Sequence, residues 1–299
     1  MPSDTYAKFF NVIREVATLR SVEALLDWDQ ETYMPPRGAQ HRGEQGALVA
    51  GLAHERFTSD ELGRLLEQVE REGAQDDPTV VTNVRETRRQ FDRAVKVPTE
   101  LVRDLARSTA MAKPAWAQAR RESRFELFAP HLERLLDLKR RVGAHVGYKG
   151  ERYDALMDEF EPGMTAAKVA EIFDGLKREL VPLVAEIAAA KRKPDLEILK
   201  RRCAREAQVA FSRRLAEAIG FDFNAGRLDV STHPFCTHTC PLDVRITSRY
   251  DEHFLPMSVF GTLHEVGHAL YEQGLDPQQG GAPAGCSVSL GIHESQSRM

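Results

Sequence analysis

The sequence predicts a mainly α-helical protein with a small β-structured insertion close to its carboxyl end. Three observations support this fold class. Apolar residues recur at intervals of three and four over most of the chain, alternation of period two is confined to about residues 226–250, and two histidines four residues apart follow in an apolar segment. A single domain over residues 1–299 fits this pattern, with a helical part over about 1–220 and a strand-containing part over about 221–299.

Helical spacing is clear in the first part of the chain. One stripe near the amino terminus comprises Phe9, Val12, Ile13, Val16 and Leu19, and we expect it to be buried. Between about residues 77 and 144 the pattern predicts long helices, interrupted near three prolines because proline removes a backbone hydrogen bond. These prolines are Pro98, Pro114 and Pro130.

A further helix is predicted after the breaker Pro162-Gly163, with Thr165 as its N-cap. Its apolar stripe is also expected to belong to the core. This stripe comprises Val169, Ile172, Phe173, Leu176 and Leu180.

The pattern changes after Phe221. Residues 243–247 alternate polar and apolar side chains, which predicts a strand. A helix is expected over about 257–273, with Gly274 as its stop, and a Gly/Pro-rich loop follows at 280–285. Another helix is predicted to start near Ile292.

Composition excludes several classes of function. The chain has 41 basic and 45 acidic residues, spread along 299 positions, and no basic stripe of the kind that binds nucleic acid. No apolar run is long enough to span a membrane, and Met1-Pro2-Ser3 opens no signal peptide. Four cysteines are too few for a disulfide framework. These features favour a cytoplasmic protein with reduced thiols.

The sequence His264-Glu265-Val266-Gly267-His268 is the strongest chemical signal. Histidines four residues apart lie one turn apart on the same face of a helix, so both imidazoles can bind one ion. Glu265 would then stand beside the metal, where it can take a proton from metal-bound water. Roughly 0.03 such matches are expected by chance in a chain of this composition. The motif predicts a zinc-type peptidase centre, with cobalt as an alternative metal.

A catalytic zinc needs a third protein ligand. Glu272 lies one turn beyond His268, too far from His264 to share the ion easily, so an outer, supporting role suits it better. Glu294, at the start of the next predicted helix, is the stronger candidate. His293 remains a rival ligand.

With these residues identified, the chain resembles the thermostable carboxypeptidase family of zinc metallopeptidases. The family's motifs occur in order along the chain: Trp28-Asp29-Gln30-Glu31-Thr32-Tyr33-Met34-Pro35, Glu161-Pro162-Gly163-Met164, His233-Pro234-Phe235, Asp243-x-Arg245-x-Thr247, His264-Glu265-x-x-His268 and His293-Glu294-Ser295-Gln296. The resemblance implies an almost all-helical, saddle-like body with a deep substrate groove. It also implies removal of single residues from peptide C-termini, and frequently a dimer.

The resemblance further implies specific roles for residues of this chain. His264, His268 and Glu294 would bind the metal, and Glu265 would be the general base. The tentative substrate-binding residues are His233, Asp243, Arg245 and Thr247, of which the last three share one face of the predicted strand.

Two departures from the family pattern leave alternatives open. Residues 236–240 contain two cysteines and a histidine, which we interpret as an incidental loop rather than a second metal site. The chain also stops at Met299, before the family's later motifs with their substrate-binding arginine. Arg245, Arg249 and Arg298 are weak substitutes for it. The alternatives are therefore a truncated, non-catalytic metal-binding module and a peptidase with relaxed terminal recognition. We also expect a dimer or higher oligomer.

Overall fold

The computed structural model describes residues 3–73 and 77–298. The predictions made at Met1, Pro2 and Met299 therefore lie outside the described residues. The α-helices are α1 (Asp4–Thr32), α2 (Ala39–Phe57), α3 (Asp60–Glu72), α4 (Pro78–Ala94), α5 (Thr99–Glu122), α6 (Ala129–Val146), α7 (Arg152–Met157), α8 (Ala166–Ala189), α9 (Arg205–Ala218), α10 (Leu255–Gln273) and α11 (Leu290–Gln296). The strands are β1 (Gly226–Val230), β2 (Cys236–Cys240) and β3 (Asp243–Ser248). The predicted fold class, mainly helical with a small β insertion, is confirmed.

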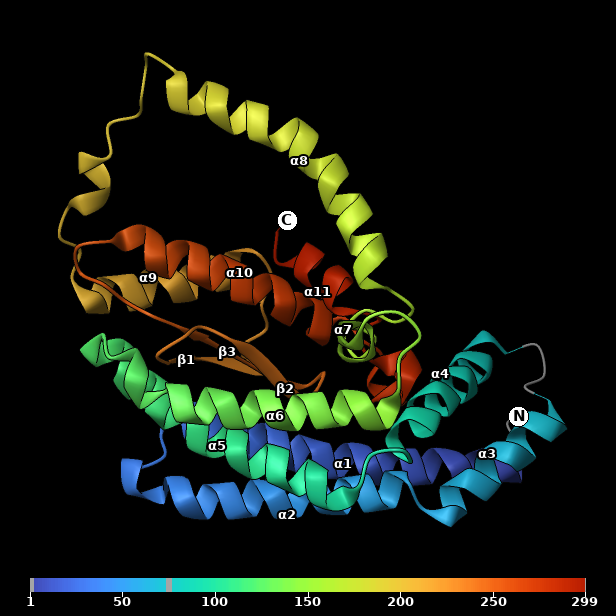
Figure 1. The fold of residues 1–299 in the computed structure, drawn as a ribbon. Helices are drawn as coiled ribbons and strands as arrows, with labels where there is room; N and C mark the ends of the chain where they lie inside the picture. The colour runs from blue at the N-terminus through green and yellow to red at the C-terminus, as the bar shows by residue number, and fades with distance from the viewer. Residues whose placement is uncertain (1–2, 74–76, 299) are drawn as a thin grey trace.

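The small sheet lies between two layers of helices (Figure 1). Its strand order is β1-β3-β2, with β1 parallel and β2 antiparallel to β3. Helices α1, α2, α5 and α6 form the layer on one side, where α1 packs against β2. On the other side, α10 packs against β3 and α9. The sheet therefore fixes the position of α10 relative to the amino-terminal helices.

Burial follows the predicted pattern in α1. Phe9, Val12, Ile13 and Val16 are all at most 5% exposed and pack against side chains of α2, α3 and α4. Leu19 is partly buried. The amino-terminal apolar stripe is thus part of the core.

One predicted helix interruption is wrong. Helix α5 runs through Pro114 without a break, whereas Pro98 and Pro130 do stand at helix starts. A proline at 114 leaves the carbonyl of Ala110, four residues earlier, without its usual donor. The side-chain amide of Gln30 on α1 donates to that carbonyl at 2.6 Å. A contact from a distant helix thus replaces the missing backbone bond.

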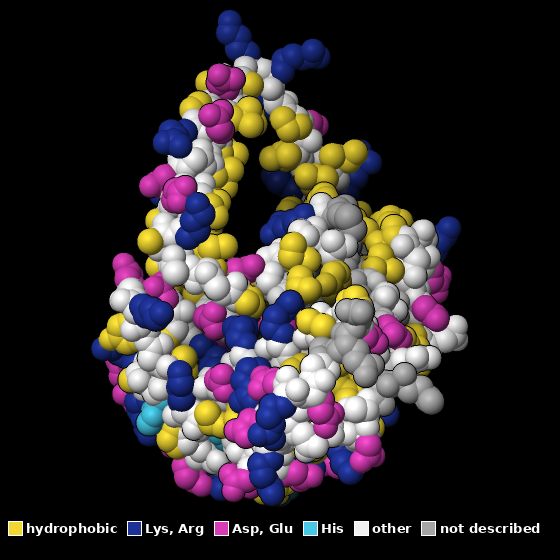
Figure 2. All heavy atoms as spheres, turned by 90° about the vertical axis from the view of Figure 1, so that its right-hand side faces the viewer, with side chains coloured by type: hydrophobic (Ala, Val, Ile, Leu, Met, Phe, Trp, Pro, Cys, Tyr) yellow, Lys and Arg dark blue, Asp and Glu magenta, His cyan; other side chains and the backbone are white. Residues whose placement is uncertain are grey.

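The prediction that the α8 stripe belongs to the core is also wrong. Thr165 does cap α8 as expected, but α8 contains no buried residue. The helix packs mainly at its start, against α7, and then arches away over α9, α10 and α11 (Figure 1). Hydrophobic side chains line the inner side of this arch (Figure 2). The exposed ones are Ile172, Phe173, Leu176, Leu180, Val181, Leu183, Val184 and Ile187.

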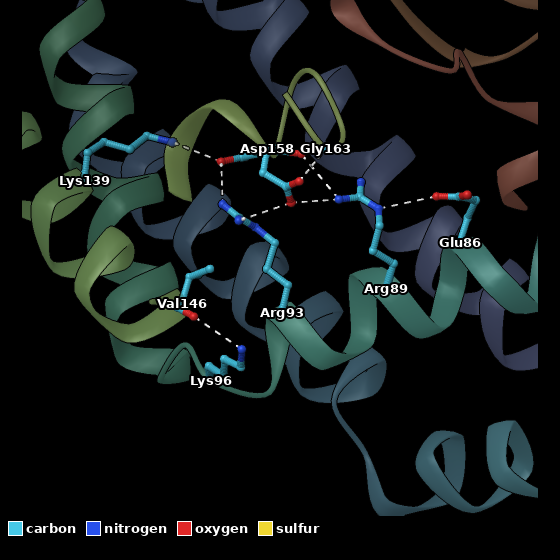
Figure 3. Close-up of polar contacts among 9 residues, drawn as sticks. Glu86, Arg89, Arg93, Lys96, Lys139, Val146, Asp158 and Gly163 are labelled. Carbon is cyan, nitrogen blue, oxygen red and sulfur yellow. Dashed lines mark hydrogen bonds and ion pairs between the residues drawn. The ribbon is translucent and has the colours of Figure 1, made fainter. Parts of the chain in front are cut away.

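An ion-pair network holds the turn that leads into α8 (Figure 3). Arg89 on α4 donates to Asp158 at 2.8 Å, and Arg93 lies 3.8 Å from both Asp158 and Glu159. Asp158 also accepts the backbone N–H of Gly163, whose φ of +77° favours glycine. The two arginines therefore anchor the turn to α4, and the Asp158 side chain stabilises the backbone of the turn itself.

Residues 236–240, expected as a loop, form strand β2, because their backbone pairs with β3. All four cysteines are free. Among the described helices, none combines the length and apolar content that a membrane span requires.

Candidate metal centre

Helix α10 presents three chemically important side chains close together. Val266 and Ala269 are fully buried against Val244 and Ile246 of β3. This packing fixes the rotation of the helix, since apolar residues at helical spacing define one buried face. The remaining face carries His264 and His268 one turn apart, while Glu265 is only 5% exposed.

Helix α11 approaches α10 at Gly267. A Cβ at this glycine would lie 2.5 Å from the carbonyl oxygen of Gln296 and 2.6 Å from Cα of Ser297, distances that no side chain tolerates. Glycine is therefore required for the two helices to meet here. At the other end of α11, the Glu161 carboxylate accepts the N–H of Gly291 at 2.9 Å. The turn before α8 thus also positions α11.

These contacts bring Glu294 to the histidines. Its Oε2 lies 3.8 Å from Nε2 of His264 and 3.8 Å from Nε2 of His268. Within the described residues, these three side chains form the one group whose donor atoms all lie within 4.8 Å of one another. Ligand atoms about 2.1 Å from a tetrahedral ion would stand roughly 3.4 Å apart, so the two distances from Glu294 to the histidines lie within about half an ångström of that value.

The burial of Glu265 changes its acidity. Removal from water raises the pKa of its carboxyl group to about 7, and the nearby negative charge of Glu294 contributes to the rise. A carboxylate whose pKa lies near neutrality is suited to accept and return a proton. Burial likewise lowers the pKa of His268 and so favours the neutral imidazole, the form that binds a cation.

His293 lies behind the donor cluster. Its Nδ1 is 2.5 Å from Nδ1 of His268, and its Nε2 is 2.8 Å from Oε1 of Glu272. Glu272 is 3% exposed and stands one turn beyond His268 on α10. The second oxygen of Glu272 lies 3.4 Å from Nδ1 of His238 on β2, a neighbour that the sequence did not indicate.

The family model described as Carboxypeptidase Taq (M32) metallopeptidase matches residues 8–299. This chain belongs to that family. It is 42% identical to Thermostable carboxypeptidase 1 of Thermus thermophilus, over 99% of this chain and 60% of the relative. It is 34% identical to Carboxypeptidase 1 of Bacillus subtilis, again over 99% of this chain and 60% of the relative.

Solved structures agree with this assignment to the M32 family. The crystal structure of BsuCP matches with a TM-score of 0.95 at 32% identity, covering 99% of this chain and 59% of that one. The M32 carboxypeptidase from Deinococcus radiodurans R1 matches with a TM-score of 0.85 at 38% identity, with the same coverage. The chain thus spans about 60% of the length of the curated relatives it matches.

The structure of this M32 chain places the predicted substrate-binding residues at different depths. His233 is exposed and meets the Trp116 ring edge-on, with 6.3 Å between ring centroids. Thr247 is fully buried, and its hydroxyl accepts the N–H of Phe235 at 2.9 Å and the hydroxyl of Ser231 at 2.7 Å. Thr247 therefore holds the loop that carries His233, and its own side chain does not reach the surface.

Asp243 and Arg245 pair with each other. The Arg245 guanidinium donates to both oxygens of Asp243 at 2.8 Å and lies 4.3 Å from the centre of the Trp28 ring. Arg227 contacts the same tryptophan at 4.7 Å and binds Asp229. The amino-terminal motif that contains Trp28 therefore contributes a cation–π contact that the sequence did not predict.

Proposed function

We propose that this chain forms the metal centre of a metal-dependent carboxypeptidase. The observation that carries the proposal is the convergence of His264, His268 and Glu294 beside the buried Glu265. Two histidine nitrogens and one carboxylate oxygen are one of the established protein ligand sets of a catalytic zinc. Membership of the M32 metallopeptidase family supports the same conclusion. We expect zinc as the metal and cobalt as a substitute with the same ligands.

In this mechanism a divalent ion held by the three ligands would supply a Lewis acid at the scissile peptide bond. Glu265 would accept a proton from the attacking water and pass it to the leaving amine. Burial, which raises the pKa of the Glu265 carboxyl group, favours the return of that proton to the amine. The buried surroundings of Glu265 keep bulk water from solvating its carboxylate.

Recognition of the terminal carboxylate is the second part of the proposal. His233 is exposed and available to a peptide. Arg245 is engaged by Asp243 and stacked on Trp28, so its guanidinium is not free to bind a carboxylate. This observation favours, for residues 1–299, a peptidase with relaxed terminal recognition as the second candidate function.

Matched peptides separate these possibilities. One peptide would carry a free C-terminal carboxylate and its twin a C-terminal amide, each incubated with the zinc-loaded chain while released products are followed by mass spectrometry. A carboxypeptidase releases the last residue from the free peptide alone. Equal cleavage of both would establish relaxed recognition, and cleavage of neither would support the non-catalytic module.

Glu265→Gln is the matched control for this assay. The amide cannot accept a proton, so hydrolysis should fall about 10²–10⁴-fold while bound zinc stays unchanged. A variant as active as the parent chain would show that the turnover comes from another base or a contaminant.

We also expect the protein in the cytoplasm. Its four cysteines are free, as thiols are in a reducing compartment.

A further inference from the structure

We propose that Glu272 and His293 form a positioning relay that fixes which nitrogen of His268 faces the metal. The inference rests on the proposed function, because it takes His268 as a metal ligand. It assigns Glu272 and His293 to a hydrogen-bonded chain that ends on His268 from the side opposite Glu294.

The contacts of this chain are short and sheltered. Nδ1 of His268 lies 2.5 Å from Nδ1 of His293, and Nε2 of His293 lies 2.8 Å from Oε1 of Glu272. The two imidazole rings are nearly parallel, at 19°, with centroids 4.5 Å apart. The side chains of His268, His293 and Glu272 are 9%, 17% and 3% exposed, respectively. Little water therefore competes for these hydrogen bonds.

The order of the protons follows from hydrogen-bond chemistry. A neutral imidazole has one N–H donor and one acceptor nitrogen. Nε2 of His268 faces Glu294 and must keep its lone pair to bind a cation, so the proton of His268 sits on Nδ1. That N–H donates to Nδ1 of His293, which places the proton of His293 on Nε2, from where it donates to Glu272. All three contacts are satisfied by this single arrangement.

The backbone explains why these residues meet. His268 and Glu272 are four residues apart on α10 and share one helix face. Helix α11 crosses them and inserts His293 between the two side chains, while Tyr271 packs edge-on against the His293 ring at 5.3 Å. An outer hydrogen bond to a ligating histidine typically accounts for 10–100-fold in metal affinity.

Metal affinity provides the first test. Zinc binding to the full 299-residue chain would be measured by competition with a chromophoric chelator. We expect Glu272→Ala and His293→Ala each to weaken binding about 10–100-fold. The double variant should be little weaker than either single one, since both act through one chain. Glu272→Gln, which keeps an acceptor oxygen, should lose less. Ser258→Ala, at a fully buried position of the same helix outside both the relay and the metal site, should bind zinc within about twofold of the parent.

The second test needs neither metal nor activity. Long-range ¹H–¹⁵N spectra of histidine-labelled, metal-free protein at pH 8 report which ring nitrogen carries the proton, since free imidazoles with a pKa of about 6.5 are then neutral. We expect His268 to be protonated on Nδ1 and His293 on Nε2, with His268 becoming a mixture in Glu272→Ala.

The two readouts distinguish failure of the relay from failure of the proposed function. The relay would be overturned if His268 were protonated on Nε2. It would also be overturned if the Glu272→Ala and His293→Ala variants folded and bound zinc as tightly as the parent. If the predicted protonation is found but His268→Ala keeps its zinc, the relay stands as a hydrogen-bond chain and the metal-site proposal fails.

Discussion

At the residue scale, the ion pair of Asp243 and Arg245 should make the stability of the folded protein depend on pH. Hydrogen bonding to Arg245 holds the pKa of the Asp243 carboxyl below its usual value, although burial opposes the effect. A lowered pKa in the folded state contributes stability above the unfolded-state pKa of about 3.9, and that stability is lost as pH falls toward the folded-state value.

Asp243→Asn should therefore destabilise the protein at pH 7 and less so in acid. Urea unfolding of both proteins at several pH values measures the difference. We expect a constant difference from pH 8 to about 5, which shrinks below about pH 4. A difference that is unchanged at pH 3.5 would show that the charge of Asp243 does not contribute.

Some residues of the site could be predicted from sequence because their geometry is local. The spacing of His264 and His268 places both imidazoles on one face of any helix, whatever surrounds it. The positions of Thr247 and Arg245 depend on contacts with the 231–235 loop and with Trp28, which lies 217 positions from Arg245 along the chain. No local pattern encodes such contacts, so alternation predicted their common face but not their burial or their partners.

At the scale of elements, the meeting of α10 and α11 depends on Gly267. We predict that Gly267→Ala pushes α11 away, destabilises the fold by about 1–3 kcal/mol and weakens zinc binding by moving Glu294. Thermal unfolding and zinc competition would measure both effects.

Gly46 in α2 is the matched control for that substitution. A Cβ at Gly46 meets nothing within 4 Å, so Gly46→Ala should stabilise the protein by about 0.5–1 kcal/mol through helix propensity. If Gly267→Ala is equally well tolerated and keeps its zinc, the close approach of the two helices does not define the site.

The continuity of α5 through Pro114 yields a second element-scale prediction. Gln30→Ala removes the donor to the Ala110 carbonyl and should cost about 1–3 kcal/mol. Adding Pro114→Ala restores a backbone N–H at position 114, so the double variant should regain most of that loss. A double variant no more stable than Gln30→Ala would show that the Gln30 contact does not replace the helical bond.

The same contact shows why the interruption predicted at Pro114 was wrong. Proline correctly predicts the helix starts at Pro98 and Pro130, because a residue in the first turn has no carbonyl earlier in the helix that needs its N–H. At Pro114 a side chain 84 positions earlier decides the outcome. Sequence spacing alone cannot reveal that compensation.

At the scale of the whole molecule, the exposed stripe of α8 predicts association. Helical spacing correctly predicted an amphipathic helix, but within the described structure its apolar face lines an open arch instead of a core (Figure 2). Two ion pairs, Lys168–Glu171 and Lys177–Asp174, lie between exposed side chains of α8, so these charges need not be buried when the apolar stripe meets a second copy of the helix. We therefore expect a dimer or higher oligomer.

Replacing Leu176 and Leu180 with Glu should shift the protein toward the monomer in light scattering. Lys168→Gln with Arg178→Gln lowers the net charge by the same two units without touching the apolar stripe, and it should leave the oligomer intact. A parent chain that is monomeric at all concentrations would contradict self-association through α8.

The central claim is that His264, His268 and Glu294 bind one metal ion. X-ray absorption spectroscopy of the zinc-loaded chain tests it most directly, because it identifies the atoms around the ion. We expect two imidazole nitrogens and carboxylate or water oxygens at about 2.0–2.2 Å. A sulfur neighbour at about 2.3 Å would place the ion at a cysteine, and a third imidazole would replace Glu294 with His293. Either result would show that these three residues are not the ligand set.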